Sequence, residues 1–285
     1  MITTQSFKSS LDVPSVNAVM EAACREAVCS PKALYLFMHR FVHYGRSYSF
    51  LVPRLAGIIG SSKLLYDPNC AIAAHAERAM DVAANVLTAA LEEFRDPRTN
   101  VSHRTLSYGL LDKLAEYAGL SQAEIKDVAT SGDWLAGVLK AVNEGYDAQS
   151  DDLSSMVRAM GFHVGAEIVG EYECSIINEV LYSEQRQTQF GQFIKQNKLH
   201  FEAGSVSPWY WIVIHGTFGT KGVELKHSDG ALLALNQVVQ YADASEAQIV
   251  EWADQGFAQF NQTQQRFFQL VHQELRRLSP LLVAI

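Results

Sequence analysis

The sequence predicts an all-α protein made of a single domain. Apolar residues recur with the helical period along nearly every long segment. Prolines number only seven in 285 residues, and the alternating apolar and polar runs that mark half-buried strands are absent from the sequence. No repeat, low-complexity segment or linker rich in glycine, serine or proline divides the chain. Residues 1–285 are therefore expected to form one domain in which helix packs on helix.

The first two helices are predicted from their caps. A helix over residues 12–28 has Asp12 as its N-cap and an apolar stripe on one face. A second helix over residues 31–52 follows Ser30 and a proline, which are favoured residues at the N-cap and the first helical position. Pro53 is expected to break or kink this helix, because proline lacks a backbone N–H.

Similar signals mark the helices that follow. Asp67 and a proline open a segment rich in alanine and leucine, and Ser102 is placed to cap another helix. Residues 209–214, "WYWIVI", look like a strand, but the helical pattern around them favours the start of a buried helix. The last helix is expected to end before Pro280. These further helices, which bring the expected total to eight to ten, cover residues 67–94, 102–119, 121–130, 133–147, 151–182, 183–201, 207–242 and 245–278.

Composition excludes several classes of protein. Hydrophobic residues make up 48% of the chain, enough for a large core, and 31 acidic against 23 basic residues give a net charge of −8, which argues against nucleic-acid binding. The four cysteines show no metal-binding or disulfide spacing and are expected to be buried thiols in a reducing compartment; they are Cys24, Cys29, Cys70 and Cys174. With no secretory signal and no apolar run of membrane length in the sequence, the expected location is the cytoplasm.

Carboxylates and histidines inside apolar helices are the candidate functional residues, because a buried charge is costly unless it is paired, hydrogen-bonded or bound to a metal. Glu224 and His227 are three residues apart, which places both side chains on one face of a helix. Alone, this pair is more typical of a solvated helix turn than of a metal site. His215 follows a very apolar run and is open to interpretation as a core histidine. Three glycines before Glu224 allow the chain to loop back and bring His215 to the same side.

A second cluster contains Glu92, Glu93 and His103. One glutamate lies at the C-terminal end of a buried helix, where the helix dipole disfavours an anion, so it needs a partner. His103 opens the next helix after a short turn and is placed to face that glutamate. The alternative is that both glutamates are exposed and that His103 is merely close to a helix cap.

A third cluster lies in one apolar helix and contains His163, Glu167, Glu171 and Glu173. Three glutamates within seven residues cannot all face solvent while the apolar residues between them stay buried. The helical period places Glu167 and Glu171 on a common face and Glu173 elsewhere. At least one glutamate is expected to face the interior, and the spacing does not say which.

These clusters resemble the ligand pattern of the heme-oxygenase-like non-heme diiron oxygenases, a superfamily that includes fatty-acid-decarboxylating oxidases, N-oxygenases and a chlamydial death-domain-associating protein. In that family a glutamate near a helix end is followed shortly by a histidine, and "EEFRDPRTNVSHRTL" is similar, matching Glu93 and His103. A glutamate inside a helix comes next, and "GEYECSII" is similar, matching Glu173. Glu167 in "GFHVGAEI" is the alternative match.

The last family segment is His-x-x-x-Asp-x-x-His, and Glu224 and His227 match its second half. The first gap is longer here, so His215 is the least well matched ligand. The resemblance implies a heme-oxygenase-like multi-helix bundle, two bound iron ions with manganese as an alternative, and O₂-dependent oxidation or cleavage of a small organic substrate. Three histidines and three carboxylates suit divalent iron or manganese. A ferritin-like site would need two Glu-x-x-His pairs, and the candidate ligands provide only one.

Other proteins with this fold use different chemistry, which leaves a second hypothesis. Thiaminase-like relatives are metal-free and use a cysteine nucleophile with a glutamate, and Cys174 beside Glu173 permits such a site or a simple ligand-binding protein. Heme oxygenases bind heme through a histidine near the N-terminus. Here His39 and His43 are better interpreted as residues of a core helix that cap the cavity. The expected partners are the substrate and O₂, with a homodimer as a possible assembly and with neither nucleic acid nor a membrane.

Overall fold

The computed structural model describes residues 1–65, 71–216 and 223–282, without the side chains of residues 72–77, 89, 223–226 and 279–282. The prediction of an all-α protein is confirmed, with twelve α-helices and one short β-hairpin in these residues. The helices are α1 Val13–Ala27, α2 Pro31–Gly45, α3 Tyr48–Ser61, α4 Ile72–Phe94, α5 His103–Tyr117, α6 Gln122–Thr130, α7 Asp133–Gly145, α8 Leu153–Asn178, α9 Gln189–Gln196, α10 Tyr210–His215, α11 Val223–Tyr241 and α12 Glu246–Leu282. The strands are β1 Leu199–Phe201 and β2 Gly204–Val206.

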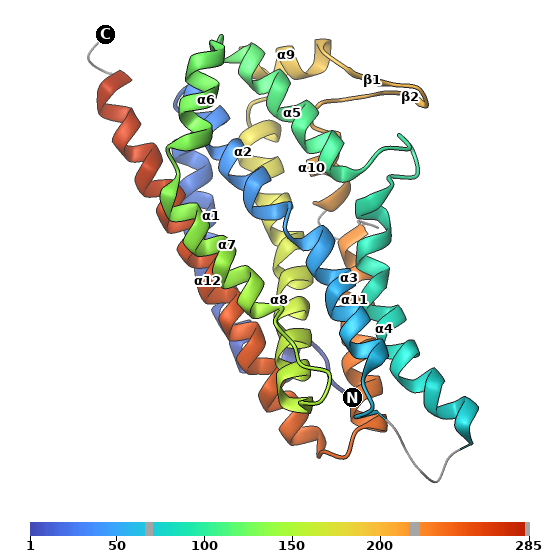
Figure 1. Cartoon of the computed structure of the whole chain (residues 1–285). Coiled ribbons are helices and arrows are strands. Elements are labelled where there is room, and N and C mark those ends of the chain that lie inside the picture. Colours follow the sequence, from blue (N-terminus) through green and yellow to red (C-terminus); the bar gives the residue numbers. More distant parts are fainter. Residues whose placement is uncertain (66–70, 217–222, 283–285) are drawn as a thin grey trace.

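Helix α8 is the centre of the molecule. It runs between α1 and α12 on one side and α3, α4 and α11 on the other, and the short α10 packs near its C-terminal end (Figure 1). A helix surrounded in this way must be apolar on nearly all faces, and most residues of α8 are buried. Two charged residues of α8, Glu167 and Glu173, are therefore placed in the interior of the bundle. No helix in the described ranges is both long enough and apolar enough to cross a membrane.

The predicted helix caps are confirmed in part. The hydroxyl of Ser30 accepts a hydrogen bond from the backbone N–H of Ala33 at 3.1 Å, and that of Ser102 accepts one from Thr105 at 3.2 Å. Asp12 precedes α1 but makes no capping hydrogen bond through its side chain, because its backbone already has helical dihedral angles. Asp67 lies outside the described residues.

The helix expected over residues 31–52 is two helices, and the break lies at Arg46 and Ser47 rather than at Pro53. Pro53 lies inside α3, in its second turn. At that position proline removes a single backbone hydrogen bond, the one to the carbonyl of Ser49, and packing against α4 compensates for the loss.

Two further segments differ from their predictions. Residues 183–201 were expected to be helical, but only α9 is, and the chain then forms a hairpin in which Leu199 pairs with Val206. Strands of three residues are too short to show an alternating pattern. Residues 207–242 form two helices, α10 and α11, and α12 continues past Pro280, where proline again costs one hydrogen bond near a helix end.

The cysteines are only partly as expected. Cys24 and Cys174 are buried, which agrees with the prediction. Cys29 is exposed, because it lies beyond the C-terminal end of α1, where the chain turns at the surface toward α2. Cys70 lies outside the described residues.

Glycines allow α8 and α12 to cross closely. A Cβ atom on Gly161 would overlap the backbone carbonyl of Ala253, and one on Gly256 would overlap the carbonyl of Arg158. We expect Gly161→Ala or Gly256→Ala to lower the free energy of unfolding by about 3 kcal/mol, since neither helix can move away without separating the core. Urea denaturation of each variant measures this loss.

The matched control for these variants is Gly137→Ala in α7, where no atom lies within 4 Å of the new methyl group. This change is expected to raise the stability by roughly 0.5–1 kcal/mol, because alanine is the better helix former. Equal effects of all three substitutions would contradict a close crossing of α8 and α12.

Candidate metal centre

A partly open cavity of about 110 Å³ lies beside α8 in the middle of the bundle. Its wall is built from α2, α3, α4, α8, α10, α11 and α12, so residues distant in the sequence meet there. Aromatic rings form much of the lining, and the described lining residues include no lysine or arginine. The titratable residues with nitrogen or carboxylate ligand atoms in this lining are Glu93, Glu167, Glu173, His215 and His227.

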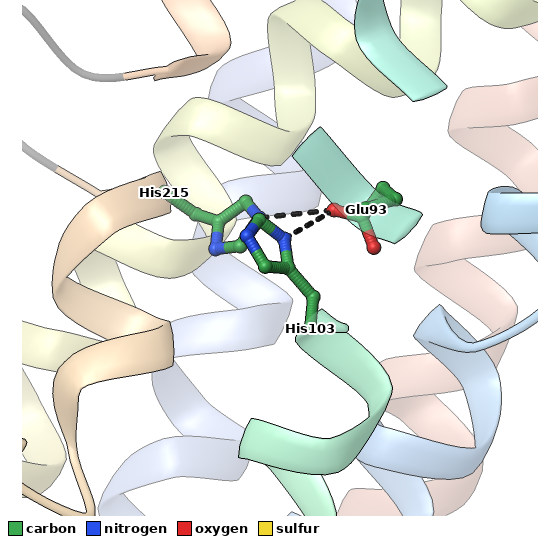
Figure 2. Close-up of side chains that lie close together, drawn as sticks. All are labelled: Glu93, His103 and His215. Atoms are coloured by element: carbon green, nitrogen blue, oxygen red, sulfur yellow. Dashed lines mark hydrogen bonds and ion pairs between the residues drawn. The ribbon is translucent and has the colours of Figure 1, made fainter. Parts of the chain in front are cut away.

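Three residues form a compact cluster at one side of the cavity. Glu93 comes from the end of α4, His103 is the first residue of α5, and His215 is the last residue of α10 (Figure 2). Oε1 of Glu93 lies 2.8 Å from Nδ1 of His103 and 3.2 Å from Nε2 of His215. One ligand atom from each residue lies within 4.8 Å of the others, a spacing that can hold a metal ion.

Local structure brings these three residues together. The turn between α4 and α5 is short because the carboxylate of Asp96 accepts a hydrogen bond from the backbone N–H of Thr99 at 2.6 Å. Asn100 takes a left-handed conformation, with φ of 62°, which lets the chain reverse. Gly216, directly after His215, packs so closely on the backbone of Cys174 that a Cβ atom would overlap it. Close packing at Gly216 thus places His215 beside α8.

The hydrogen bonds of His215 fix the state of its ring. Nδ1 lies 2.7 Å from the carbonyl oxygen of Trp211, which can only accept, so Nδ1 carries a proton. Nε2, which faces the Glu93 carboxylate, then has two alternatives. It either carries a second proton, which makes the ring an imidazolium, or presents a lone pair. A lone pair would repel the carboxylate oxygen unless a cation lay between them. Both alternatives match a site built for positive charge.

The pKa of the Glu93 carboxyl follows from the same contacts. Burial by itself raises this pKa, but the hydrogen bonds with His103 and His215 outweigh burial and hold it well below its usual range. Glu93 is therefore a carboxylate at neutral pH, which is the form that binds metal ions.

A second cluster of an acid and histidines is centred on α8. Oε1 of Glu167 is 3.3 Å from Nδ1 of His163, one helical turn earlier, and Oε2 is 3.4 Å from Nδ1 of His227 in α11. The hydroxyl of Tyr146 also contacts His163 Nδ1, at 3.2 Å. His163 is only 1% exposed, and its Nε2 has no hydrogen-bond partner among the described residues. Burial, with the nearby charge of His227, lowers the pKa of His163 despite the opposing effect of Glu167, so the ring is neutral at neutral pH.

The structure separates the three glutamates of α8. Glu167 and Glu173 both line the cavity, whereas Glu171 is half-buried and does not. At least one of these glutamates was expected to face the interior, and two do, because the cavity covers a wide stripe of α8 that includes both Glu167 and Glu173. Glu167, the alternative match, is the one in contact with His227.

Of the predicted ligands outside α8, three meet in one cluster. The structure brings Glu93, His103 and His215 together, although His215 was the least well matched of all. The side chain of Glu224 lies outside the described part of the chain. His163 was noticed within the third cluster but was not among the predicted ligands. Its position four residues before Glu167, on the same helix face, is the signal that could have identified it.

His39 and His43 are not among the residues that line the cavity, which corrects the expectation that they cap it. They lie one turn apart in α2, and their rings are in tilted contact, with centroids 4.3 Å apart. Burial, and then mainly the charge of His43, lowers the pKa of His39 to about 3, while burial and the charge of Arg46 lower that of His43 to about 4. Both rings are neutral at neutral pH and act as packing residues.

Acid is expected to destabilise the protein through these two histidines. Between pH 6.5, the ordinary histidine pKa, and about pH 4, the unfolded chain binds protons at His39 and His43 and the folded protein does not. Unfolding therefore takes up protons, and the free energy of unfolding falls as the pH falls. Replacing His43 with phenylalanine is expected to flatten this dependence, measured by urea denaturation from pH 7.5 to 4.5. His272→Phe in α12 is the control, and an unchanged slope for His43→Phe would contradict the explanation.

The donor atoms of both clusters are imidazole nitrogens and carboxylate oxygens, the set that divalent iron and manganese accept. The buried Nε2 of His163 and the two nitrogens that face Glu93 are consistent with such an ion. Comparisons of the chain with protein-family models, with curated proteins and with solved structures find no match. The class of the protein is therefore inferred from its fold and from this geometry.

Proposed function

We propose that the protein is a non-heme diiron or iron–manganese oxygenase with a heme-oxygenase-like bundle, which activates O₂ to oxidise or cleave a small organic substrate. One observation carries the proposal: two clusters of carboxylates and histidines, from α4, α5 and α10 and from α8 and α11, both contribute residues to the lining of one cavity. Buried acids and histidines are costly in the middle of a bundle unless they bind something. The small substrate and O₂ are the partners that a cavity of this size admits.

The residues present fit a pair of divalent ions. Glu93, His103 and His215 would hold one ion, and Glu167 and His227 the other; His163 lies within reach of Glu167. Glu173 is the carboxylate of the lining that remains to complete either ion. When bound, such ions supply a place for O₂ to bind and the electrons for its activation.

The remaining lining residues shape the space around the clusters. Phe41, Trp211 and Phe260 present apolar rings that exclude water. Tyr48 donates a hydrogen bond to the hydroxyl of Tyr44 at 2.9 Å. Burial, with the charge of Glu173, raises the pKa of Tyr44 far above its usual value, so the phenol keeps its proton. The cavity therefore offers a substrate apolar contact with a few polar groups along one wall.

A metal-free, thiaminase-like or ligand-binding protein is the second candidate. Cys174 lines the same cavity, next to Glu173, which is the arrangement that a thiol nucleophile with a carboxylate base requires. Cys174→Ser separates the two proposals, because it would abolish activity in the second and leave metal binding intact in the first.

Metal analysis tests the proposed function. Protein expressed with added iron is expected to contain close to two iron or manganese ions per chain, located by anomalous scattering at the iron edge. His103→Ala and His227→Ala are expected to lower the metal content and O₂ consumption, whereas His272→Ala, which changes a histidine of α12 that does not line the cavity, is not. The oxygenase proposal would be contradicted if the protein bound neither metal and if His103→Ala and His227→Ala left activity unchanged.

A further inference from the structure

Both ring nitrogens of His103 have a carboxylate within 4 Å, although only Nδ1 makes a hydrogen bond. The side chain is almost completely buried, at 1% exposure. Nδ1 faces the cluster and lies 2.8 Å from Glu93. Nε2 points to the opposite side, where the facing carboxylate oxygen is Oδ2 of Asp96 at 3.9 Å. No described residue makes a hydrogen bond with this nitrogen, and Asp96 is the carboxylate that lies within ion-pair distance of it.

Asp96 is a buried carboxylate held in a fixed orientation. Oδ1 accepts hydrogen bonds from the backbone N–H groups of Arg98 and Thr99 and from the hydroxyl of Thr99, at 3.1, 2.6 and 2.7 Å. Oδ2 accepts one from the hydroxyl of Tyr210 at 3.0 Å. Burial raises the pKa of Asp96, but these hydrogen bonds outweigh burial and lower it, so the group is charged at neutral pH. Tyr210 keeps its proton, since burial and the bond to Asp96 raise its pKa to about 12.

The turn between α4 and α5 does not need Oδ2 of Asp96. The three side-chain bonds of Asp96 within the turn all go to Oδ1, whereas Oδ2 lies on the side of His103 and is held there by a residue of α10. A neutral imidazole offers a lone pair on one nitrogen and a proton on the other. In metal sites, the proton on the outer nitrogen of a histidine ligand is commonly donated to a carboxylate or a backbone carbonyl, which fixes the ring and its tautomer.

His215 already shows this arrangement, with its outer nitrogen, Nδ1, donating to the carbonyl of Trp211. His103 is the second histidine of the same cluster. We infer that Asp96 is the positioning residue of His103: it attracts the proton to Nε2 and leaves Nδ1 as the nitrogen offered to a metal, with Tyr210 holding Asp96 in place. The inference rests on the proposed function, since it concerns how the cluster binds its metal.

The test is Co²⁺ binding to the full-length protein prepared without metal. The apparent dissociation constant is measured by competition with a chromophoric chelator, and the visible absorption band of bound Co²⁺ reports the ligand geometry. Asp96→Asn keeps an acceptor oxygen for the turn but removes the charge, and its amide can donate to Nε2, which would place the proton on Nδ1. We expect a loss of roughly 10- to 100-fold in affinity and a changed Co²⁺ band.

Two further variants separate positioning from folding. Tyr210→Phe removes only the bond to Oδ2 and is expected to weaken binding to a smaller extent, with a shift of the band in the same direction. Thr99→Val removes a bond to Oδ1 and is the control, with unchanged affinity and band expected. Thermal unfolding of each metal-free variant establishes that it folds. If Asp96→Asn does not fold, the comparison of Tyr210→Phe with Thr99→Val tests the inference. Weaker Co²⁺ binding and a shifted band in Tyr210→Phe alone support it, and equal affinities and bands overturn it.

The outcomes distinguish this inference from the proposed function. Unchanged affinity and band in Asp96→Asn and Tyr210→Phe, with binding lost in His103→Ala, would overturn the role of Asp96 and leave the metal centre in place. An equal loss in Thr99→Val would show that the turn matters and the carboxylate does not. Wild-type protein that binds no Co²⁺, Fe²⁺ or Mn²⁺ would overturn both.

Discussion

Replacing Glu93 with glutamine is expected to lower the affinity for a divalent metal by about 100-fold or more, and with it any O₂-dependent activity. Glu93 is the residue that both His103 and His215 contact, through the same oxygen atom. Glutamine keeps the size of the side chain but brings no negative charge and offers its oxygen only as a weak ligand. Changes in the groups that surround metal ligands cost 10- to 100-fold, so loss of a charged ligand is expected to reach at least the upper end of that range. Calorimetric titration with Mn²⁺ or Fe²⁺ under anaerobic conditions measures the effect.

Glu92 provides the matched control. It is the neighbouring residue, also a half-buried glutamate, and it is not part of the cluster. Glu92→Gln is expected to leave metal affinity unchanged. That result would exclude the change in net charge and the position at the end of α4 as causes of the affinity loss in Glu93→Gln. Similar losses in the two variants would mean that the end of α4 contributes a general negative field and no ligand.

Replacing Glu274 with alanine is expected to lower the free energy of unfolding by about 3–5 kcal/mol, because it leaves a buried guanidinium without its counter-charge. Arg40 in α2 is 1% exposed and makes two hydrogen bonds to Glu274 in α12, at 3.0 and 2.6 Å. The same arginine donates to the carbonyl of Val128 at 2.7 Å, and Trp134 donates to Glu274 at 3.1 Å. One ion pair thus joins α2, α12 and the region of α6 and α7. Urea denaturation followed by circular dichroism gives the loss.

The double variant Arg40→Met with Glu274→Leu tests the cause. Removing both charges leaves no unpaired ion, so the double variant is expected to be more stable than Glu274→Ala despite two large changes. A double variant less stable than both single variants would show that packing and the hydrogen bonds to neighbouring groups, and not the buried charge, dominate at this position.

Much of the fold could be predicted because it depends on local signals. Ser30 and Ser102 cap their helices as expected, since a cap involves only a few adjacent residues. The break at Arg46 and Ser47 was missed because nothing local demands it, and Pro53 was misleading because a proline in an early turn is tolerated. The hairpin that pairs Leu199 with Val206 was missed because its strands are too short to carry a pattern.

In the candidate site too, the contacts between residues close in sequence could be predicted, and those that depend on helix packing could not. Glu93 and His103 were paired from ten residues of sequence, whereas contact of His215 with Glu93 depends on how α10 packs against α8. The choice between Glu167 and Glu173 depends on which surface of α8 the cavity covers, and helical periodicity does not contain that information. His163 was noticed in the sequence but not chosen as a ligand, because its spacing of four residues from Glu167 carries weight only once Glu167 is known to face the interior.

The short turn that Asp96 holds between α4 and α5 has a consequence for the order in which the protein assembles. Closing the chain between Glu93 and His103 spans ten residues, while bringing His215 to Glu93 closes a loop of 122 residues. Short loops close sooner and at a smaller entropic cost than long ones. During folding, Glu93 and His103 are therefore expected to come together before α10 brings the third residue, His215, to them. At the proposed metal centre, tight metal binding would then come late in folding, and the ion would stabilise the finished fold without nucleating it.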